Sequence, residues 1–174
     1  SDNGQVYSND GIVFTYYQVP IVTSMVPKLG SVTGGTHVNI TGSNLINIPS
    51  LYCRWGDGSL LPVPPLSTTS TSIICVTPSA PSQHVYLYIS INGQDYYNSG
   101  IEYEYVPVPS VYRISPSYGT ELSATTLTVY GVNFINSATT MCSFGTFVPT
   151  VSVPATFISS HELQCETPLL SAGT

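Results

Sequence analysis

The four cysteines are the residues of this sequence best suited to covalent chemistry. They form two pairs, Cys53 with Cys75 and Cys142 with Cys165, separated by 22 and 23 residues. A zinc site is disfavoured because the closely spaced Cys and His ligands of such sites are absent. We therefore predict one disulfide within each pair, and closing loops of this length stabilises a fold by roughly 3 kcal/mol. Disulfides imply an oxidising compartment.

Acidic and histidine side chains offer little else for catalysis. Glu102 and Glu104 alternate along one segment, but no histidine or third ligand accompanies them. His37 and the pair His161-Glu162 lack any neighbouring nucleophile motif. The spaced acidic ligands of a calcium loop are also missing. We predict no catalytic, cofactor-binding or metal site, and a protein that is not an enzyme.

Two features could carry glycans. Asn39-Ile40-Thr41 is an N-glycosylation sequon, with Asn39 at a polar position of its segment. A Ser/Thr run follows the proline-rich stretch at 62–65, a composition typical of O-glycosylated segments, although a plain flexible loop is equally compatible with it. The candidate O-linked positions are Ser67, Thr68, Thr69, Ser70, Thr71 and Ser72.

Charge is scarce in this chain. Only 7% of its 174 residues are charged, three of them basic, and the formal net charge is −6. Binding of nucleic acid or of anionic lipid needs clustered Lys and Arg, so neither partner is expected. No apolar run is long enough to span a bilayer, and we expect no membrane contact by this segment. Such a surface stays soluble through glycans or through burial in an assembly.

The hydrophobic pattern predicts strands throughout. Val38 and Ile40 alternate with polar neighbours, as do the apolar positions of residues 85–89 and 101–105. Glycine and proline punctuate these segments, and no stretch keeps a helical period. The pattern is typical of an all-β sandwich with short strands and frequent turns.

The sequence repeats itself at an offset of 89 residues. Gly42 corresponds to Gly131 at this offset, and Cys53 corresponds to Cys142. The offset grows to 90 by the second cysteines, so one residue is inserted between the cysteines of the second copy. Residues 11–16 match residues 100–105 at the same offset, which extends the pattern to the beginning of the chain.

The order of these features resembles the IPT/TIG family. The motifs are Ser-x-x-Pro-x-x-Gly, Gly-Gly-Thr-x-Val-x-Ile-x-Gly-x-Asn, Cys-x-Trp-Gly, Cys-x-Thr-Pro and Gly-Ile-x-Tyr-x-Tyr. The second copy departs from this pattern, because it reads Glu121-Leu122-Ser123-Ala124-Thr125 where Gly-Gly-Thr is expected. The resemblance implies tandem immunoglobulin-like β-sandwiches, a fold found in plexin- and Met-like receptor ectodomains, and it carries no common catalytic residues.

Module boundaries follow from the repeat and the resemblance together. Residues 19–106 are expected to form a complete IPT/TIG module, and residues 107–174 a module that lacks its last strands. Residues 1–18 are expected to be the C-terminal strands of a preceding or partner module. The linker Val106-Pro107-Val108-Pro109 is short and stiff because alternate prolines favour extended geometry.

These observations favour an extracellular structural or adhesive role. We expect a repeat segment of a glycoprotein stalk, fibre or filament, whose partners are neighbouring modules or other copies of itself, and glycans. The alternative is a set of ligand-binding modules in a receptor ectodomain. Both hypotheses place the chain outside the cell, secreted or at the cell surface.

Overall fold

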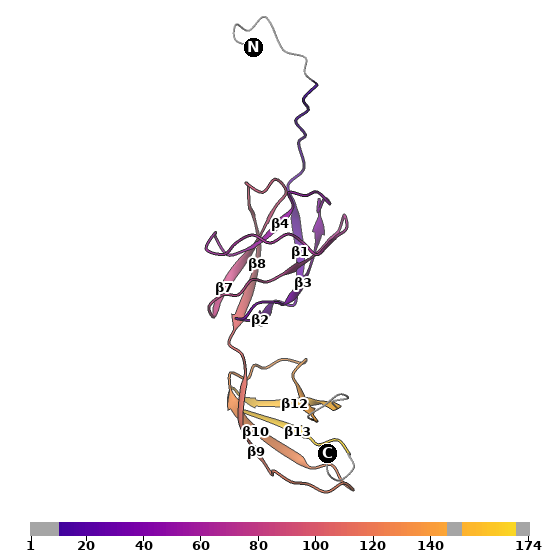
Figure 1. The fold of residues 1–174 in the computed structure, drawn as a ribbon, viewed down its shortest axis with the longest axis vertical. Coiled ribbons are helices and arrows are strands. Elements are labelled where there is room, and N and C mark those ends of the chain that lie inside the picture. The colour runs from indigo at the N-terminus through magenta and orange to yellow at the C-terminus, as the bar shows by residue number, and fades with distance from the viewer. Residues whose placement is uncertain (1–10, 146–150, 170–174) are drawn as a thin grey trace, which may run out of the picture. The chain divides into compact units, whose positions relative to one another are not determined.

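The computed structural model describes residues 11–145 and 151–169 of the chain (Figure 1). The described residues contain strands and turns and no helix, which confirms the predicted all-β class. The chain divides into two compact units. Unit 1 comprises the residues up to Gly30 together with Gly34–Tyr105, and unit 2 comprises Ser31–Thr33 together with the residues from Val106 onward.

Unit 1 is a sandwich of two four-stranded sheets. The first sheet has the order β1-β3-β6-β5 and the second the order β2-β8-β7-β4. The strands of the first are β1 (Ile21–Val26), β3 (His37–Ser43), β6 (Ser72–Val76) and β5 (Ser67–Thr68). Those of the second are β2 (Leu29–Ser31), β8 (Tyr97–Val106), β7 (Gln83–Ser90) and β4 (Tyr52–Trp55).

The core of unit 1 lies between these sheets. Alternation turns Val38 and Ile40 of β3 inward, and both are fully buried. The second sheet contributes three stacked aromatic rings: Trp55 lies 4.8 Å from Tyr103, and Tyr103 lies 5.1 Å from Tyr105 between ring centroids. Each of these rings has no exposed surface. They are the largest fully buried side chains of the sandwich, and aromatic side chains bury large apolar areas.

Unit 2 has one antiparallel sheet with the order β11-β12-β13-β10-β9. Its long strand β12 pairs first with β11 and then with β13, so it carries the sheet around from one layer to the other. The strands are β9 (Ser110–Ser115), β10 (Thr126–Val132), β11 (Met141–Phe144), β12 (Val151–Ser159) and β13 (Glu162–Glu166).

The repeated glycine and asparagine have the same structural role in both units. At Gly42 an added Cβ would collide with the carbonyl oxygen of Ile21, and at Gly131 with that of Ser110. Two residues later, an asparagine in the left-handed region donates its side-chain amide to a carbonyl just before the first strand. The bonds are Asn44 Nδ2 to Val19 O (2.9 Å) and Asn133 Nδ2 to Val108 O (3.1 Å).

Among its described residues, unit 2 has no counterpart of the short strand β2 or of the long strands β7 and β8. Strands β9, β10, β11 and β13 correspond by sequence to β1, β3, β4 and β6. Among the described residues from Val106 onward, no strand corresponds to β7 or β8. The face that those strands cover in unit 1 is therefore uncovered by any described strand of unit 2.

Replacing Gly42 by alanine tests this account of the repeat. The added methyl group has no room beside Ile21, so we expect Gly42→Ala to lower the free energy of unfolding of unit 1 by about 3 kcal/mol. Gly35→Ala is the control: it meets open space and costs only left-handed backbone strain, about 1 kcal/mol. Denaturation followed by the fluorescence of Trp55, the one tryptophan, reports on unit 1. Equal costs for both variants would contradict the steric explanation.

Candidate functional site

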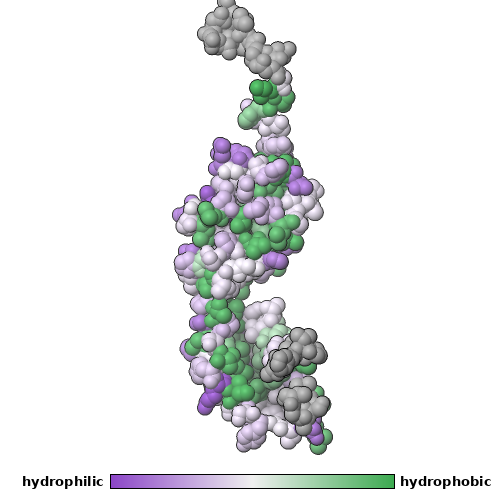
Figure 2. All heavy atoms as spheres, in the orientation of Figure 1, coloured by the Kyte–Doolittle hydropathy of each residue, from purple (hydrophilic) through white to green (hydrophobic). Residues whose placement is uncertain are grey.

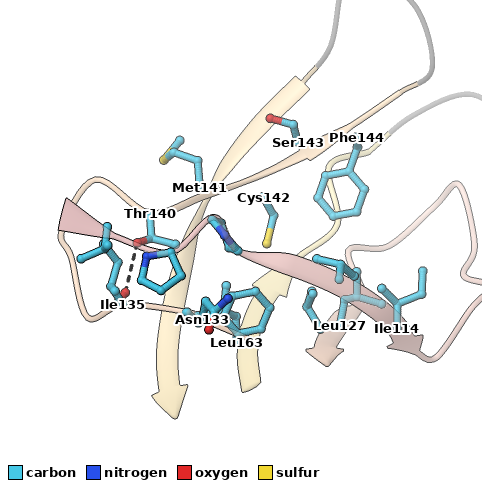
Figure 3. A pocket seen from close by; sticks show the side chains of 16 residues that line it. Ile114, Leu127, Asn133, Ile135, Thr140, Met141, Cys142, Ser143, Phe144 and Leu163 are labelled. Atoms are coloured by element: carbon cyan, nitrogen blue, oxygen red, sulfur yellow. Dashed lines mark hydrogen bonds between the residues drawn. The ribbon is translucent and has the colours of Figure 1, made fainter. Parts of the chain in front are cut away.

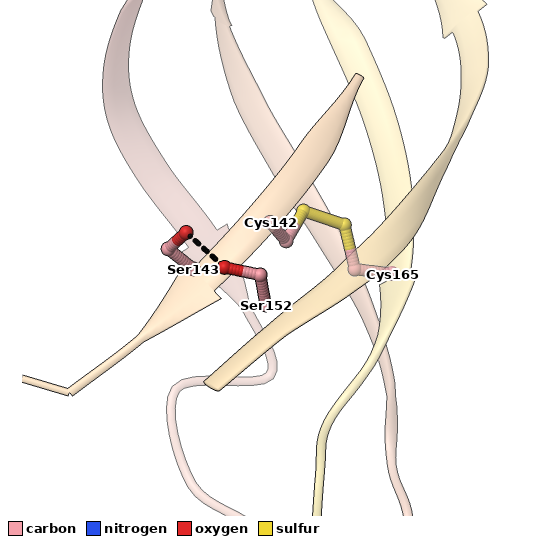
Figure 4. The surroundings of a disulfide bond; sticks show 4 residues. All are labelled: Cys142, Ser143, Ser152 and Cys165. Atoms are coloured by element: carbon pink, nitrogen blue, oxygen red, sulfur yellow. Dashed lines mark hydrogen bonds between the residues drawn. A yellow bond between two sulfur atoms is a disulfide. The ribbon is translucent and has the colours of Figure 1, made fainter. Parts of the chain in front are cut away.

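A disulfide joins the two layers of each unit. Cys53 of β4 is bonded to Cys75 of β6 with their Cα atoms 6.5 Å apart, and both residues are fully buried. In unit 2, Cys142 of β11 is bonded to Cys165 of β13 with a Cα distance of 6.4 Å (Figure 4). These are the pairs expected from the sequence. In unit 1 the bond links β6 of the first sheet to β4 of the second sheet, and in unit 2 it links β13 to β11.

The acidic and histidine residues do not assemble into a reactive site. Over residues 11–145 and 151–169, no group of three or more His, Cys, Asp or Glu side chains could hold a metal ion. Glu104 lies 3.9 Å from the His84 ring, and both side chains are largely exposed. Glu102 lies opposite Tyr86 on the neighbouring strand, and its negative charge raises the pKa of the Tyr86 phenol. His37 and His161 are exposed at separate places on the chain.

Two of the three basic residues are stacked on tyrosine rings. The Arg54 guanidinium lies 3.9 Å from the ring centroid of Tyr96 and 5.1 Å from that of Tyr88. Arg113 lies 4.1 Å above the ring of Tyr130. Cation–π stacking on Arg54 holds Tyr88 and Tyr96 in place beside β4 and β7. Together with Tyr86, these residues form a tyrosine-rich surface. With three basic residues in the whole sequence, the chain has little positive charge to attract a polyanion.

Asn39 is exposed at the centre of the first sheet of unit 1. Its strand β3 is paired on both sides, with Asn39 opposite Val26 of β1 and Ile74 of β6. The side-chain oxygen accepts a hydrogen bond of 2.7 Å from Ser72 Oγ. Because that bond uses Oδ1, the side-chain nitrogen that would carry a glycan remains free of it.

The Ser/Thr run is more ordered than a loop. Ser67 and Thr68 form β5, and Ser72 begins β6. Between them, Thr69 Oγ1 accepts a hydrogen bond of 2.9 Å from the backbone N–H of Ser72, which closes a tight turn. The flexible loop that the sequence left open as an alternative therefore does not describe either end of this run, where the residues pair in strands.

An apolar cavity lies on the inner face of unit 2. A cavity of about 520 Å³ opens there between the sheet and the linker residues Val106 and Pro107 (Figure 3). No acidic or basic side chain lines it. Its wall consists mainly of apolar residues of β9, β10, β11 and β13 and of the β10–β11 loop, which include Ile114, Leu127, Val129, Phe134, Cys142, Phe144 and Leu163.

Comparison with unit 1 shows why this cavity exists. Ile114 corresponds to Met25, which has no exposed surface, yet Ile114 is 42% exposed. Phe144 corresponds to the fully buried Trp55 and is only partly buried. The sequence singled out Cys142 and the linker residues Val106, Pro107 and Pro109 for other reasons, and it predicted no cavity that they line.

A family model now identifies the repeated unit. The IPT/TIG domain model matches residues 20–105 and again residues 109–174. The chain belongs to the IPT/TIG family. The two matches fall one on each compact unit, and the resemblance seen in the motifs is confirmed. The IPT/TIG modules of this chain are immunoglobulin-like β-sandwiches in tandem.

Individual relatives agree with this assignment. Fibrocystin-L of Mus musculus is 40% identical over 76 residues, which cover 43% of this chain and 2% of that protein. The full extracellular region of plexin A4 superimposes with a TM-score of 0.56 at 20% identity, covering 91% of this chain and 13% of that one. The chain thus spans a small part of each relative's length, and the plexin likeness shows the fold.

The chain is an extracellular IPT/TIG repeat segment. Disulfides within both modules fit an oxidising compartment such as the cell exterior. In the part of the chain that the structure describes, no helix is long and apolar enough to cross a membrane.

Alkaline pH tests the buried tyrosine at the centre of the first module. Burial raises the pKa of Tyr105 above its ordinary value of 10.0. The unfolded state therefore loses this proton first, and the stability that the neutral phenol provides, fully present below about pH 10, falls by roughly 1 kcal/mol by pH 11. Tyr105→Phe should reduce this alkaline loss, measured by denaturation with Trp55 fluorescence. Tyr17→Phe, at an exposed position, should leave it unchanged; equal slopes in all three proteins would refute the assignment.

Proposed function

We propose that this chain is a structural or adhesive repeat segment of an extracellular glycoprotein stalk, fibre or filament. The observation that carries the proposal is the repetition itself. Two successive modules keep the same cross-layer disulfide, the same glycine contact and the same asparagine cap, while the described residues bring no reactive site together. A non-catalytic role is part of the proposal. Repeated modules without a reactive site suit a protein that spans a distance and presents surfaces for contact.

The surface supports the glycoprotein part of this role. Asn39 stands on the outer face of the first sheet of unit 1, so a glycan there would cover that face and leave the β7–β8 side open. Few charges are available to solubilise such a surface. Of the candidate O-linked positions, Ser67 and Thr68 form the edge strand of the same sheet, and Ser72 of β6 is hydrogen-bonded to Asn39. Glycans gathered on one sheet would direct protein contacts to the other.

A receptor role is the second candidate, and the tyrosine-rich surface favours it. Tyr86 is 43% exposed, and Tyr88 and Tyr96 are held by Arg54. Ordered tyrosines bury contact area at a low entropic cost, which suits a protein-binding surface. In this case the chain would act as ligand-binding modules of an ectodomain.

Immunogold labelling of the native protein separates the two roles. An antibody against unit 1 should label stalks, fibres or filaments outside the cell at repeated positions if the structural role holds. Labels scattered singly over the plasma membrane, together with saturable binding of one soluble ligand to the tyrosine-rich surface, would overturn it in favour of the receptor.

N-glycosylation at Asn39 is tested by secretion from a eukaryotic host. We expect the wild-type chain to lose mass on treatment with an N-glycosidase and Asn39→Gln to show no such change. The matched pair Thr41→Ser and Thr41→Ala tests the sequon itself, because only the serine retains the required hydroxyl. Identical masses before and after treatment of the wild type would show that Asn39 is unmodified.

A further inference from the structure

An open groove of about 560 Å³ lies on unit 1 beside the β7–β8 loop. Its wall comes from the loop before β4, from β4 itself, from the proline-rich segment after β4 and from the β7–β8 loop. All of its lining residues belong to unit 1, the complete module. They include Tyr52, Pro62, Asn92, Gly93, Gln94 and Tyr96.

Two tyrosine rings form the apolar part of this groove. Cys53 of β4 is fully buried, so Tyr52 next to it points outward from the sheet. The Tyr52 ring lies beside the loop backbone, since a Cβ added at Gly93 would stand 3.6 Å from Tyr52 Cε2. The Tyr96 ring has the Arg54 guanidinium on one face, 3.9 Å from its centroid. That contact fixes the ring and leaves its second face available to a ligand.

The loop that carries Tyr96 is held by its own hydrogen bonds. Asn92 Oδ1 accepts bonds from the backbone N–H groups of Gln94 (3.0 Å) and Asp95 (2.8 Å). Gly93 has a left-handed φ of 73°, and its N–H donates to Ser90 Oγ at 2.9 Å. Side chains that bond to nearby backbone in this way stabilise a turn. The groove is therefore formed before a ligand arrives, and binding costs little ordering entropy.

Three uncharged polar groups at the groove are left for a ligand. The Tyr52 hydroxyl, the Tyr96 hydroxyl and the Gln94 side-chain amide make no hydrogen bond to any other residue that the structure describes. A tyrosine hydroxyl and a side-chain amide can each donate and accept. Together they match a ligand that presents several hydroxyl groups.

The groove itself is uncharged. No acidic or basic side chain lines it, and the two charged groups next to it are engaged, Arg54 on the Tyr96 ring and Asp95 Oδ2 with the Asn92 amide. A charged ligand would thus find no counter-ion in the lining to offset its desolvation. The wider surface of unit 1 is similarly mixed: on the face that Figure 2 shows, hydrophobic residues lie among weakly polar ones.

We propose that this groove binds a neutral carbohydrate. A pyranose ring has an apolar C–H face and a rim of hydroxyl groups, and the groove offers a surface for each. The C–H face packs on the free face of Tyr96, which removes apolar area from water and meets the negative face of the aromatic ring. The sugar hydroxyls exchange hydrogen bonds with the Tyr52 hydroxyl and the Gln94 amide. Arg54 acts as a positioning residue, because it touches Tyr96 and not the sugar.

This site gives the adhesive role proposed above a ligand and rests on that role. Asn39 and the candidate O-linked positions Ser67 and Thr68 belong to the first sheet, whereas β4, β7 and β8 at the groove belong to the second. A module that carries glycans on one sheet and binds sugar beside the other can hold neighbouring glycosylated chains together.

A glycan array probed with the 174-residue chain tests the ligand class. The array displays neutral oligosaccharides of mannose, glucose, galactose, xylose and N-acetylglucosamine beside sialylated, uronic-acid and sulfated ones. We expect binding to neutral glycans, and no gain in binding from added carboxylate or sulfate groups. Absence of binding to every neutral glycan, or binding to the acidic glycans alone, would overturn the proposal.

An NMR titration of the ¹⁵N-labelled chain with the neutral glycan that binds best on the array locates the site. The amide signals of Gly93 and Gln94 should shift with a Kd of roughly 1 mM or below. Shifts confined to other parts of the chain would overturn the assignment to this groove. This readout needs only the wild-type chain.

Substitutions at Tyr96 separate stacking from hydrogen bonding. We expect Tyr96→Ala to weaken binding about tenfold, and Tyr96→Phe, which keeps the ring and its contact with Arg54, to bind as the wild type does. Tyr112→Ala removes a tyrosine of unit 2 that is 67% exposed and should leave the affinity unchanged. Trp55 fluorescence confirms that each variant is folded. Equal affinity of Tyr96→Ala and the wild type would contradict the proposal without touching the structural role, because immunogold labelling reports where the chain lies and needs no ligand.

Discussion

The apolar inner face of the sheet containing β3 and β6 must be covered by a second layer, and the rest of the structure depends on this constraint. In unit 1 the cover is complete: Trp55, Tyr103 and Tyr105 pack against one another over a disulfide that links the layers. Unit 2 keeps the disulfide, but the described residues do not provide the cover. Its core residues remain 3–7% exposed where their counterparts in unit 1 are fully buried. The covalent link holds the layers together, and only strands can exclude water from between them.

This constraint connects the fold with the role proposed for it. A module completed by its own strands is closed, and it can be repeated as a spacer whose surface is free for glycans or contacts. The low charge of the chain fits this role, because few charged groups have to be desolvated when such a surface is covered by glycans or by a neighbouring module.

Much of this architecture could be predicted from the sequence, because strands, turns and disulfides leave local signals. The alternation at Val38 and Ile40 identified the core face, and the repeated cysteines and Gly42 identified the modules. The structure of the Ser/Thr run could not be predicted, since the pairing of Ser67 and Thr68 with β6 is a long-range contact without a local pattern. The path of β12 from one layer to the other was also unpredictable, because its alternation is compatible with either partner. The cavity of unit 2 could not be predicted for a related reason: its lining residues have the composition of any other core.

Hydrogen exchange at β11 would test most directly whether the inner face of unit 2 is open. The amides of Met141 and Ser143, which point away from β12, should exchange rapidly in the 174-residue chain, while the equivalent amides of Tyr52 and Arg54 stay protected because β7 pairs with β4. Protection of Met141 and Ser143 equal to that of Tyr52 and Arg54 would show that this face is closed, and would contradict this account.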